Sequence, residues 1–164
     1  MALNDLKDVY LDQIQDIYSA CSQSLEATTK LGQAAKDEEL GKALAAGSKG
    51  ISDGMAKLEQ ICGDHGIDPT GEHCKGMEGV VAEAQAHALD EEFGSDDARD
   101  AMIISQYQRM VHYAIAGYGC CAAYANRLGL DGDAALLKEC LDQTREGDVH
   151  MNKIAENSVN PKAA

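Results

Sequence analysis

Apolar residues recur at alternating steps of three and four along four long stretches of the chain, which is the spacing of an α-helix with one buried face. The stretches lie at about 4–33, 37–63, 96–128 and 133–156. A shorter helix is expected at about 74–89, after the turn-rich segment GDHGIDPTGEH. Gly129 is expected to end the third long helix in the left-handed conformation. The pattern predicts a four-helix bundle with a short crossover helix between the second and third long helices.

Composition agrees with an all-α fold. The chain has 164 residues, 45% of them apolar, with two prolines, one phenylalanine and no tryptophan. This length is enough to bury a core without disulfides or metals. We therefore expect one domain spanning residues 1–164, with a flexible, frayed tail from about residue 158.

Charge narrows the possible partners. The net charge of −14 disfavours binding to nucleic acid or to an anionic membrane surface, since both need clustered Lys and Arg. The first residues, MALNDLKDVY, resemble neither a signal peptide nor a membrane span. A cytoplasmic protein whose six cysteines are reduced at rest is expected.

Two features break the apolar stripes. Thr144 and Asp148 stand where the last long helix should be apolar, and the second helix carries glycines in the segment GSKGISDG. Each glycine inside a helix costs about 1 kcal/mol relative to alanine. The glycines indicate either a close approach of two helices or a cavity.

Four segments carry a resemblance to a known family: QDIYSACSQ, AKLEQICGDHGIDPTGEHCKGMEGVVAEAQ, RDAMIISQYQRMVHYAIAGYG and IAENSVN. Together they resemble the YciE/YciF-type family of ferritin-like bacterial stress proteins, in order and along essentially the whole chain. The resemblance implies a ferritin-like bundle, a homodimer and an association with stress. It also implies a fold in which carboxylates from several helices can build a two-metal centre.

The positions that hold the family's metal ligands carry other residues here. By the resemblance, a glutamate of the first helix is replaced by Cys21, and carboxylates or imidazoles of the other helices are replaced by Gly47, Gly50, Val111, Ala114, Gln143 and Thr144. Only Asp148 remains as an inward carboxylate. A divalent ion in such a bundle needs four to six oxygen or nitrogen ligands. We therefore expect no metal at the bundle centre.

The lost side-chain volume could instead leave a pocket for a small ligand. Its candidate residues are Cys21, Gly47, Gly50, Val111, Ala114, Tyr118, Thr144 and Asp148. Tyr18, Tyr107 and Tyr113 lie within a few turns of this level and could also line it. The competing interpretation is a core that has closed up, because protein interiors rarely keep large voids.

Two alternative metal sites stay open. Cys21 and Asp148 could form an atypical thiol-containing or single-metal centre for copper, zinc or iron. Cys62, His65, His73 and Cys74 lie close together in sequence and have the ligand chemistry of tetrahedral zinc, although their spacing matches no familiar finger. His112 adds no ligand at the centre, because it follows Val111 and points about 100° away from that stripe.

No motif of nucleophilic catalysis or of phosphate or dinucleotide binding occurs in the sequence. The expected function is therefore that of a non-enzymatic stress-associated protein that acts by association or by binding a small ligand. The alternative is a metalloprotein with an atypical centre, related to peroxide or to metals.

Overall fold

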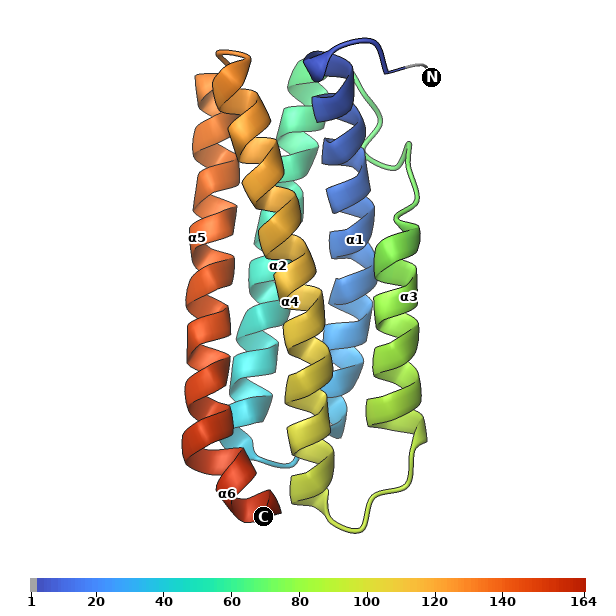
Figure 1. Ribbon diagram of the computed structural model, residues 1–164, viewed down its shortest axis with the longest axis vertical. Helices are drawn as coiled ribbons and strands as arrows, with labels where there is room; N and C mark the ends of the chain where they lie inside the picture. The colour runs from blue at the N-terminus through green and yellow to red at the C-terminus, as the bar shows by residue number, and fades with distance from the viewer. Residues whose placement is uncertain (1–2) are drawn as a thin grey trace.

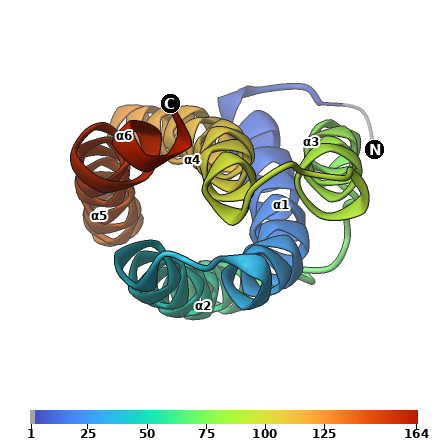
Figure 2. The same ribbon diagram turned by 90° about the horizontal axis from the view of Figure 1, so that it is seen from below.

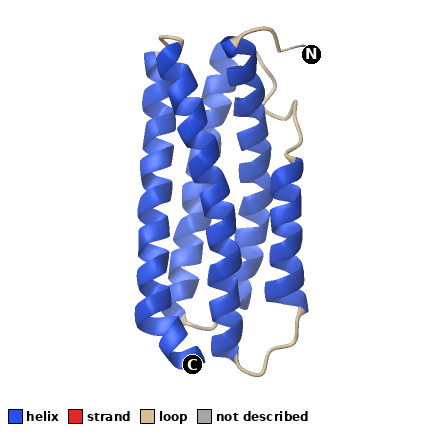
Figure 3. Ribbon diagram, in the orientation of Figure 1, coloured by secondary structure: helices blue, strands red, loops and turns tan. Residues whose placement is uncertain are grey.

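The computed structural model describes residues 3–164 and consists of helices joined by loops (Figures 1 and 3). No strand occurs within the described residues, so the predicted all-α class is confirmed. The long helices are α1 (Leu6–Ala34), α2 (Glu38–His65), α4 (Asp96–Arg127) and α5 (Asp131–Ile154). The shorter α3 (Lys75–Ala84) continues into a π-helical segment, η1 (Gln85–Asp90).

Helices α1, α2, α4 and α5 form a four-helix bundle, and α3 packs outside it against α1 and α4 (Figure 2). Around the bundle the order is α2, α1, α4, α5, so that α2 and α4 face each other across the diagonal. These two helices run in the same direction (Figure 1). Two parallel helices cannot be joined by a tight turn, which is why the segment containing α3 must cross over.

Polar side chains begin most of these helices. Asp5, Asp37, Cys74 and Ser95 each accept a hydrogen bond from the amide three residues later, which satisfies one of the free donors of the first turn. At the other ends, Gly66 (φ 65°) follows α2 and Gly129 (φ 72°) follows α4 in the left-handed conformation. The expectation for Gly129 is confirmed.

A buried carboxylate holds the turn between α1 and α2. Asp100 of α4 is 1% exposed and accepts hydrogen bonds from the amides of Lys36, at 3.0 Å, and Asp37, at 2.6 Å. The turn therefore docks on the start of α4 through charge-assisted hydrogen bonds in a dry environment.

At the opposite end of the bundle, a hydrogen-bonded cluster joins α1, α2 and α5. Lys7 Nζ lies 2.9 Å from His65 Nδ1, and His65 Nε2 lies 2.7 Å from Asp133 Oδ2, which also accepts from the Tyr10 hydroxyl at 2.8 Å. An ammonium group can only donate, so His65 accepts at Nδ1 and donates from Nε2 to Asp133. This chain of bonds fixes how the three helices meet.

The C-terminal residues differ from the prediction. Instead of fraying from about residue 158, the chain forms the π-helical segment η2 (Ala155–Val159) and the short helix α6 (Asn160–Ala163). Ser158 and Lys162 both donate to Asp37 Oδ2, at 2.9 and 2.7 Å, and Val159 is buried. Local composition suggested a tail, whereas a distant carboxylate and an apolar contact order it.

Asp100→Ala is expected to lower the free energy of unfolding by about 3 kcal/mol, because two amides would lose a buried acceptor. Urea denaturation at neutral pH measures the change. Asp96→Ala, at the exposed first turn of the same helix, serves as the matched control and should cost only a few tenths of a kcal/mol. Equal effects of the two variants would contradict the role assigned to Asp100.

The hydrogen bonds that Asp37 accepts predict that the free energy of unfolding depends on pH in the acid range. The hydrogen bond from Lys162, with those from Leu40 and Ser158, lowers the pKa of Asp37 from 3.8 to about 2. A carboxyl group with a lowered pKa stabilises the fold above its ordinary pKa and loses that contribution as the pH falls toward the lowered value. Asp37→Asn should therefore cost about 1 kcal/mol at pH 7, reduced by the exposure of Lys162, and the difference from wild type should vanish between pH 4 and pH 2.

Acid titration of both proteins by circular dichroism, with urea midpoints at each pH, measures this difference. Asp53→Asn removes an exposed i,i+4 ion pair with Lys49 and should change stability little at any pH. A wild-type advantage over Asp37→Asn that persisted unchanged at pH 2 would show that the charge of Asp37 does not contribute.

Candidate functional site

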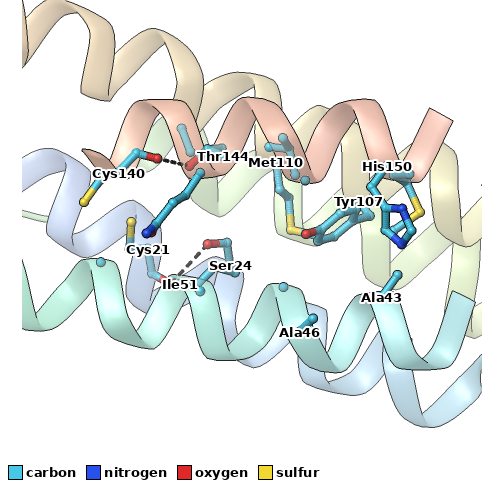
Figure 4. Close-up of a pocket in the computed structure, with 18 of the residues that line it drawn as sticks. Cys21, Ser24, Ala43, Ala46, Ile51, Tyr107, Met110, Cys140, Thr144 and His150 are labelled. Atoms are coloured by element: carbon cyan, nitrogen blue, oxygen red, sulfur yellow. Dashed lines mark hydrogen bonds between the residues drawn. The ribbon is translucent and has the colours of Figure 1, made fainter. Parts of the chain in front are cut away.

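A cavity of about 190 Å³ lies in the middle of the bundle (Figure 4). Its floor comes from α1 and α4, and its mouth lies between α2 and α5, where Gly50, Gln143 and Gly147 are exposed. The predicted pocket residues that line it are Cys21, Gly47, Gly50, Val111, Ala114, Tyr118 and Thr144. The structure therefore brings together seven of the eight candidates, and the core at this level has not closed up.

Tyrosines of α4 reach across the diagonal to glycines of α2. A Cβ atom at Gly47 would collide with the hydroxyl of Tyr107, and one at Gly54 would lie 2.8 Å from the hydroxyl of Tyr118. Gly50, between the two, has no heavy atom within 4 Å of its Cβ position. At Gly47 and Gly54 the space is taken by tyrosine side chains that reach across the diagonal, and not by a close approach of the two helices, whereas the Cβ position of Gly50, which is exposed at the mouth of the cavity, is open.

One end of the cavity carries two thiols beside a phenol. Cys21 Sγ lies 3.3 Å from the Tyr118 hydroxyl, and Cys140 also neighbours that hydroxyl. Burial raises the pKa of Cys21 to about 12, raises the pKa of Cys140, and holds the pKa of Tyr118 well above its ordinary value. At neutral pH this end of the wall is therefore uncharged.

Tyr107 lies at the other end of the cavity, near the exposed His150 (Figure 4). Met151 also lines the cavity. Tyr107 is 6% exposed, and burial, followed by the charge of Asp148, raises its pKa. Its hydroxyl has no hydrogen-bond partner among residues 3–164. The wall at this end thus presents a neutral phenol whose donor is uncommitted.

Asp148 does not line the cavity, which corrects the expectation that it faces Cys21 and Gly50. Its carboxylate lies between α4 and α5, 3.1 Å from His112 Nε2 and 3.4 Å from Gln108 Nε2. His112 is exposed and off the apolar stripe, as its position beside Val111 predicts. Cys21 and Asp148 therefore do not form the shared centre that the first metal alternative requires.

The face of α5 that lines the cavity differs from the predicted face, because Gly147 stands there in place of the neighbouring Asp148. The cavity is lined by Cys140, Thr144, Gly147 and Met151, whereas the sequence pattern placed Asp148 on this face. Both sets have helical spacing, so periodicity alone does not separate them. Cys140 was not among the predicted pocket residues for this reason, although its place one turn before Thr144 is a usable signal.

The four residues of the zinc alternative do not converge. His65 bonds to Lys7 and Asp133, and His73 bonds to Glu78 at 2.9 Å. Cys74 caps α3, and its Sγ lies 2.9 Å from the Tyr113 hydroxyl, while Cys62 is buried in α2. Across residues 3–164, no group of three or more His, Cys, Asp or Glu side chains is arranged to hold a metal ion.

The two-metal centre of ferritin-like proteins does not fit the residues at this level. The cavity wall presents glycine, alanine, valine, neutral thiols and neutral phenols where carboxylates would be needed. Of the other tyrosines considered, Tyr18 bonds to Glu59 and Tyr113 to Cys74, both away from the cavity. The arrangement can enclose an apolar molecule and offer it a hydrogen bond.

All six cysteines are free, and Cys120 on α4 is the one that is exposed. Cys21 and Cys140 lie at the cavity, and the remaining three are buried elsewhere. Within residues 3–164, no helix is both long and apolar enough to cross a membrane.

Comparison with known proteins places the chain in a family. Residues 5–164 match the family described as "Domain of unknown function (DUF892)". The chain is 32% identical to protein YciF of Escherichia coli strain K12 over 164 residues, 99% of this chain and 98% of YciF. The crystal structure of the E. coli stress protein YciF matches with a TM-score of 0.89 at 31% identity, covering 96% of this chain and 99% of that one.

A second solved structure, YcfI from Rhodopseudomonas palustris, matches with a TM-score of 0.87 at 27% identity, covering 93% of this chain and 96% of that one. The predicted ferritin-like fold and the predicted resemblance are thereby confirmed. The similarity to YciF extends over nearly the full length of the chain, and the chain belongs to the DUF892 family.

Proposed function

We propose that this protein is a non-enzymatic, stress-associated protein that binds one small, mainly apolar molecule in the cavity of its bundle. The observation that carries the proposal is the open space beside Gly50, at the level where the resemblance expects metal ligands. The association with stress rests on the similarity to the stress protein YciF.

The size of the cavity suits a molecule with a single ring. A buried apolar cavity of about 150 Å³ in another protein admits benzene, and this cavity measures about 190 Å³. Its wall includes Ile51, Met110, Val111 and Met151, which supply apolar contacts. Binding would therefore draw mainly on burial of the ligand's apolar surface.

The route into the cavity requires no unfolding. Ala46 and Gly50 on α2 and Gly147 on α5 are small and exposed at the mouth. A flat ligand can pass between these residues with only small movements of the side chains beside them. The homodimer and the cytoplasmic location implied at the outset stay predictions.

Gly50→Leu should abolish binding of benzene, because the new side chain occupies the open space. It should also leave stability unchanged or raise it, since it removes a helix-interior glycine and fills a void. Thermal unfolding with and without benzene measures both effects, as a ligand that binds the folded state raises the melting temperature.

Gly63→Leu is the matched control, because it lies on the same helix, is exposed and has no heavy atom within 4 Å of its Cβ position. Benzene should raise the melting temperature of the wild type and of Gly63→Leu, and not that of Gly50→Leu. Absence of a shift in the wild type would contradict the proposed function.

Elemental analysis of protein purified without a metal-affinity tag tests the alternative of an atypical metal centre. The proposal expects less than stoichiometric zinc, copper and iron, and a thermal stability that chelators do not change. Cys21 and Cys140 are the thiols that could hold a soft ion beside Tyr118. A stoichiometric metal that is lost in Cys21→Ser or Cys140→Ser would overturn the proposal in favour of that alternative.

A further inference from the structure

The polar groups of the cavity wall differ in whether their hydrogen-bond donors are free. The Ser24 hydroxyl donates to the carbonyl oxygen of Cys21 at 3.1 Å, and the Thr144 hydroxyl donates to that of Cys140 at 2.7 Å. The Tyr118 hydroxyl is engaged with Cys21. These three groups line the cavity, yet their hydrogen-bonding capacity is largely spent on the protein itself.

Tyr107 is the buried exception, because the other polar side chains of the lining, Gln143 and His150, are exposed at the mouth. Its side chain is more than nine-tenths buried and lines the cavity (Figure 4). Its hydroxyl lies so close to Gly47 that a Cβ atom there would collide with it. No residue within 3–164 accepts a hydrogen bond from it. The hydroxyl oxygen itself is accessible from the cavity, since the fully buried side-chain polar atoms without a partner within residues 3–164 are Thr28 Oγ1 and Arg99 Nε, so a molecule in the cavity can accept its hydrogen bond.

The charges around the cavity restrict what that acceptor can be. No Lys or Arg lines the cavity, the Asp148 carboxylate lies on the adjoining face of α5, and the net charge of the chain is −14. A carboxylate or phosphate ligand would be repelled and would lack a counter-charge. An ammonium group would lose its hydration with no carboxylate among the lining residues to pair with it, and it could not accept the hydrogen bond from Tyr107.

We propose that the cavity selects a neutral carbonyl compound of single-ring size, whose oxygen accepts a hydrogen bond from Tyr107 and whose apolar body lies beside Gly50. This inference rests on the proposed function and adds to it the chemical class of the ligand. It assigns Tyr107 as the residue that determines specificity. The other buried residues of the wall then contribute mainly apolar contact, and the exposed Gln143 and His150 stand at the mouth.

Acetophenone and ethylbenzene form a suitable pair of probes, because they have nearly the same shape and differ by a carbonyl in place of a methylene. Their dissociation constants are measured by titration calorimetry for wild type, Tyr107→Phe and Tyr18→Phe. The ratio of the two constants in each protein isolates the carbonyl, since the apolar contacts cancel.

Tyr107→Phe should weaken acetophenone relative to ethylbenzene by about three- to tenfold, the range for one neutral hydrogen bond, while ethylbenzene binding changes little. Tyr18→Phe is the matched control, because Tyr18 bonds to Glu59 away from the cavity, and it should leave the ratio unchanged. Thermal unfolding of each variant shows that the fold is kept.

The two ways of failing are distinguishable. If both probes bind the wild type and the ratio is the same in Tyr107→Phe, the carbonyl inference is overturned and the ligand-binding function stands. If neither probe binds the wild type, the proposed function fails and the inference fails with it.

Discussion

The contact between tyrosines of α4 and glycines of α2 is the constraint on which the interior of this bundle depends. Tyr107 meets Gly47 and Tyr118 meets Gly54, and in both pairs any side chain in place of glycine would collide with the phenol. The first glycine of α2 meets the first of these tyrosines of α4 and the second glycine meets the second, so the two helices must run in parallel. A crossover segment and an open level between the pairs, at Gly50, are the structural consequences.

Most of the fold could be predicted from the sequence because it depends on spacing along the chain. Apolar periodicity located the long helices, and the left-handed glycine at Gly129 ended α4 as expected. The C-terminal residues were misjudged because their order comes from Asp37, more than a hundred positions away. The docking of the α1–α2 turn on Asp100 also joins residues far apart in sequence, 64 positions for Lys36, and carries no local signal.

The site could be predicted in part, and the errors have a physical pattern. The small residues Gly50, Val111 and Ala114 pointed to one level of the core, and they line the cavity there, because small side chains on several helices leave space where the helices face each other. Asp148 was placed wrongly because it stands four residues after Thr144, and four residues advance a helix by about 400°, which is more than one full turn. Its side chain is therefore rotated away from the cavity and toward α4. The hydrogen-bond partner of a polar side chain, such as Asp133 for His65, depends on tertiary contacts.

The cysteines differ in how readily reagents in solution can reach and modify them. Cys120 faces water, whereas Cys21 and Cys140 lie beside the cavity as protonated thiols. A water-borne oxidant or alkylating agent meets Cys120 first, and the thiolate required for reaction is scarce at the inner pair. A spectroscopic label placed on Cys120 would therefore report on the surface of α4 while leaving the cavity chemically intact.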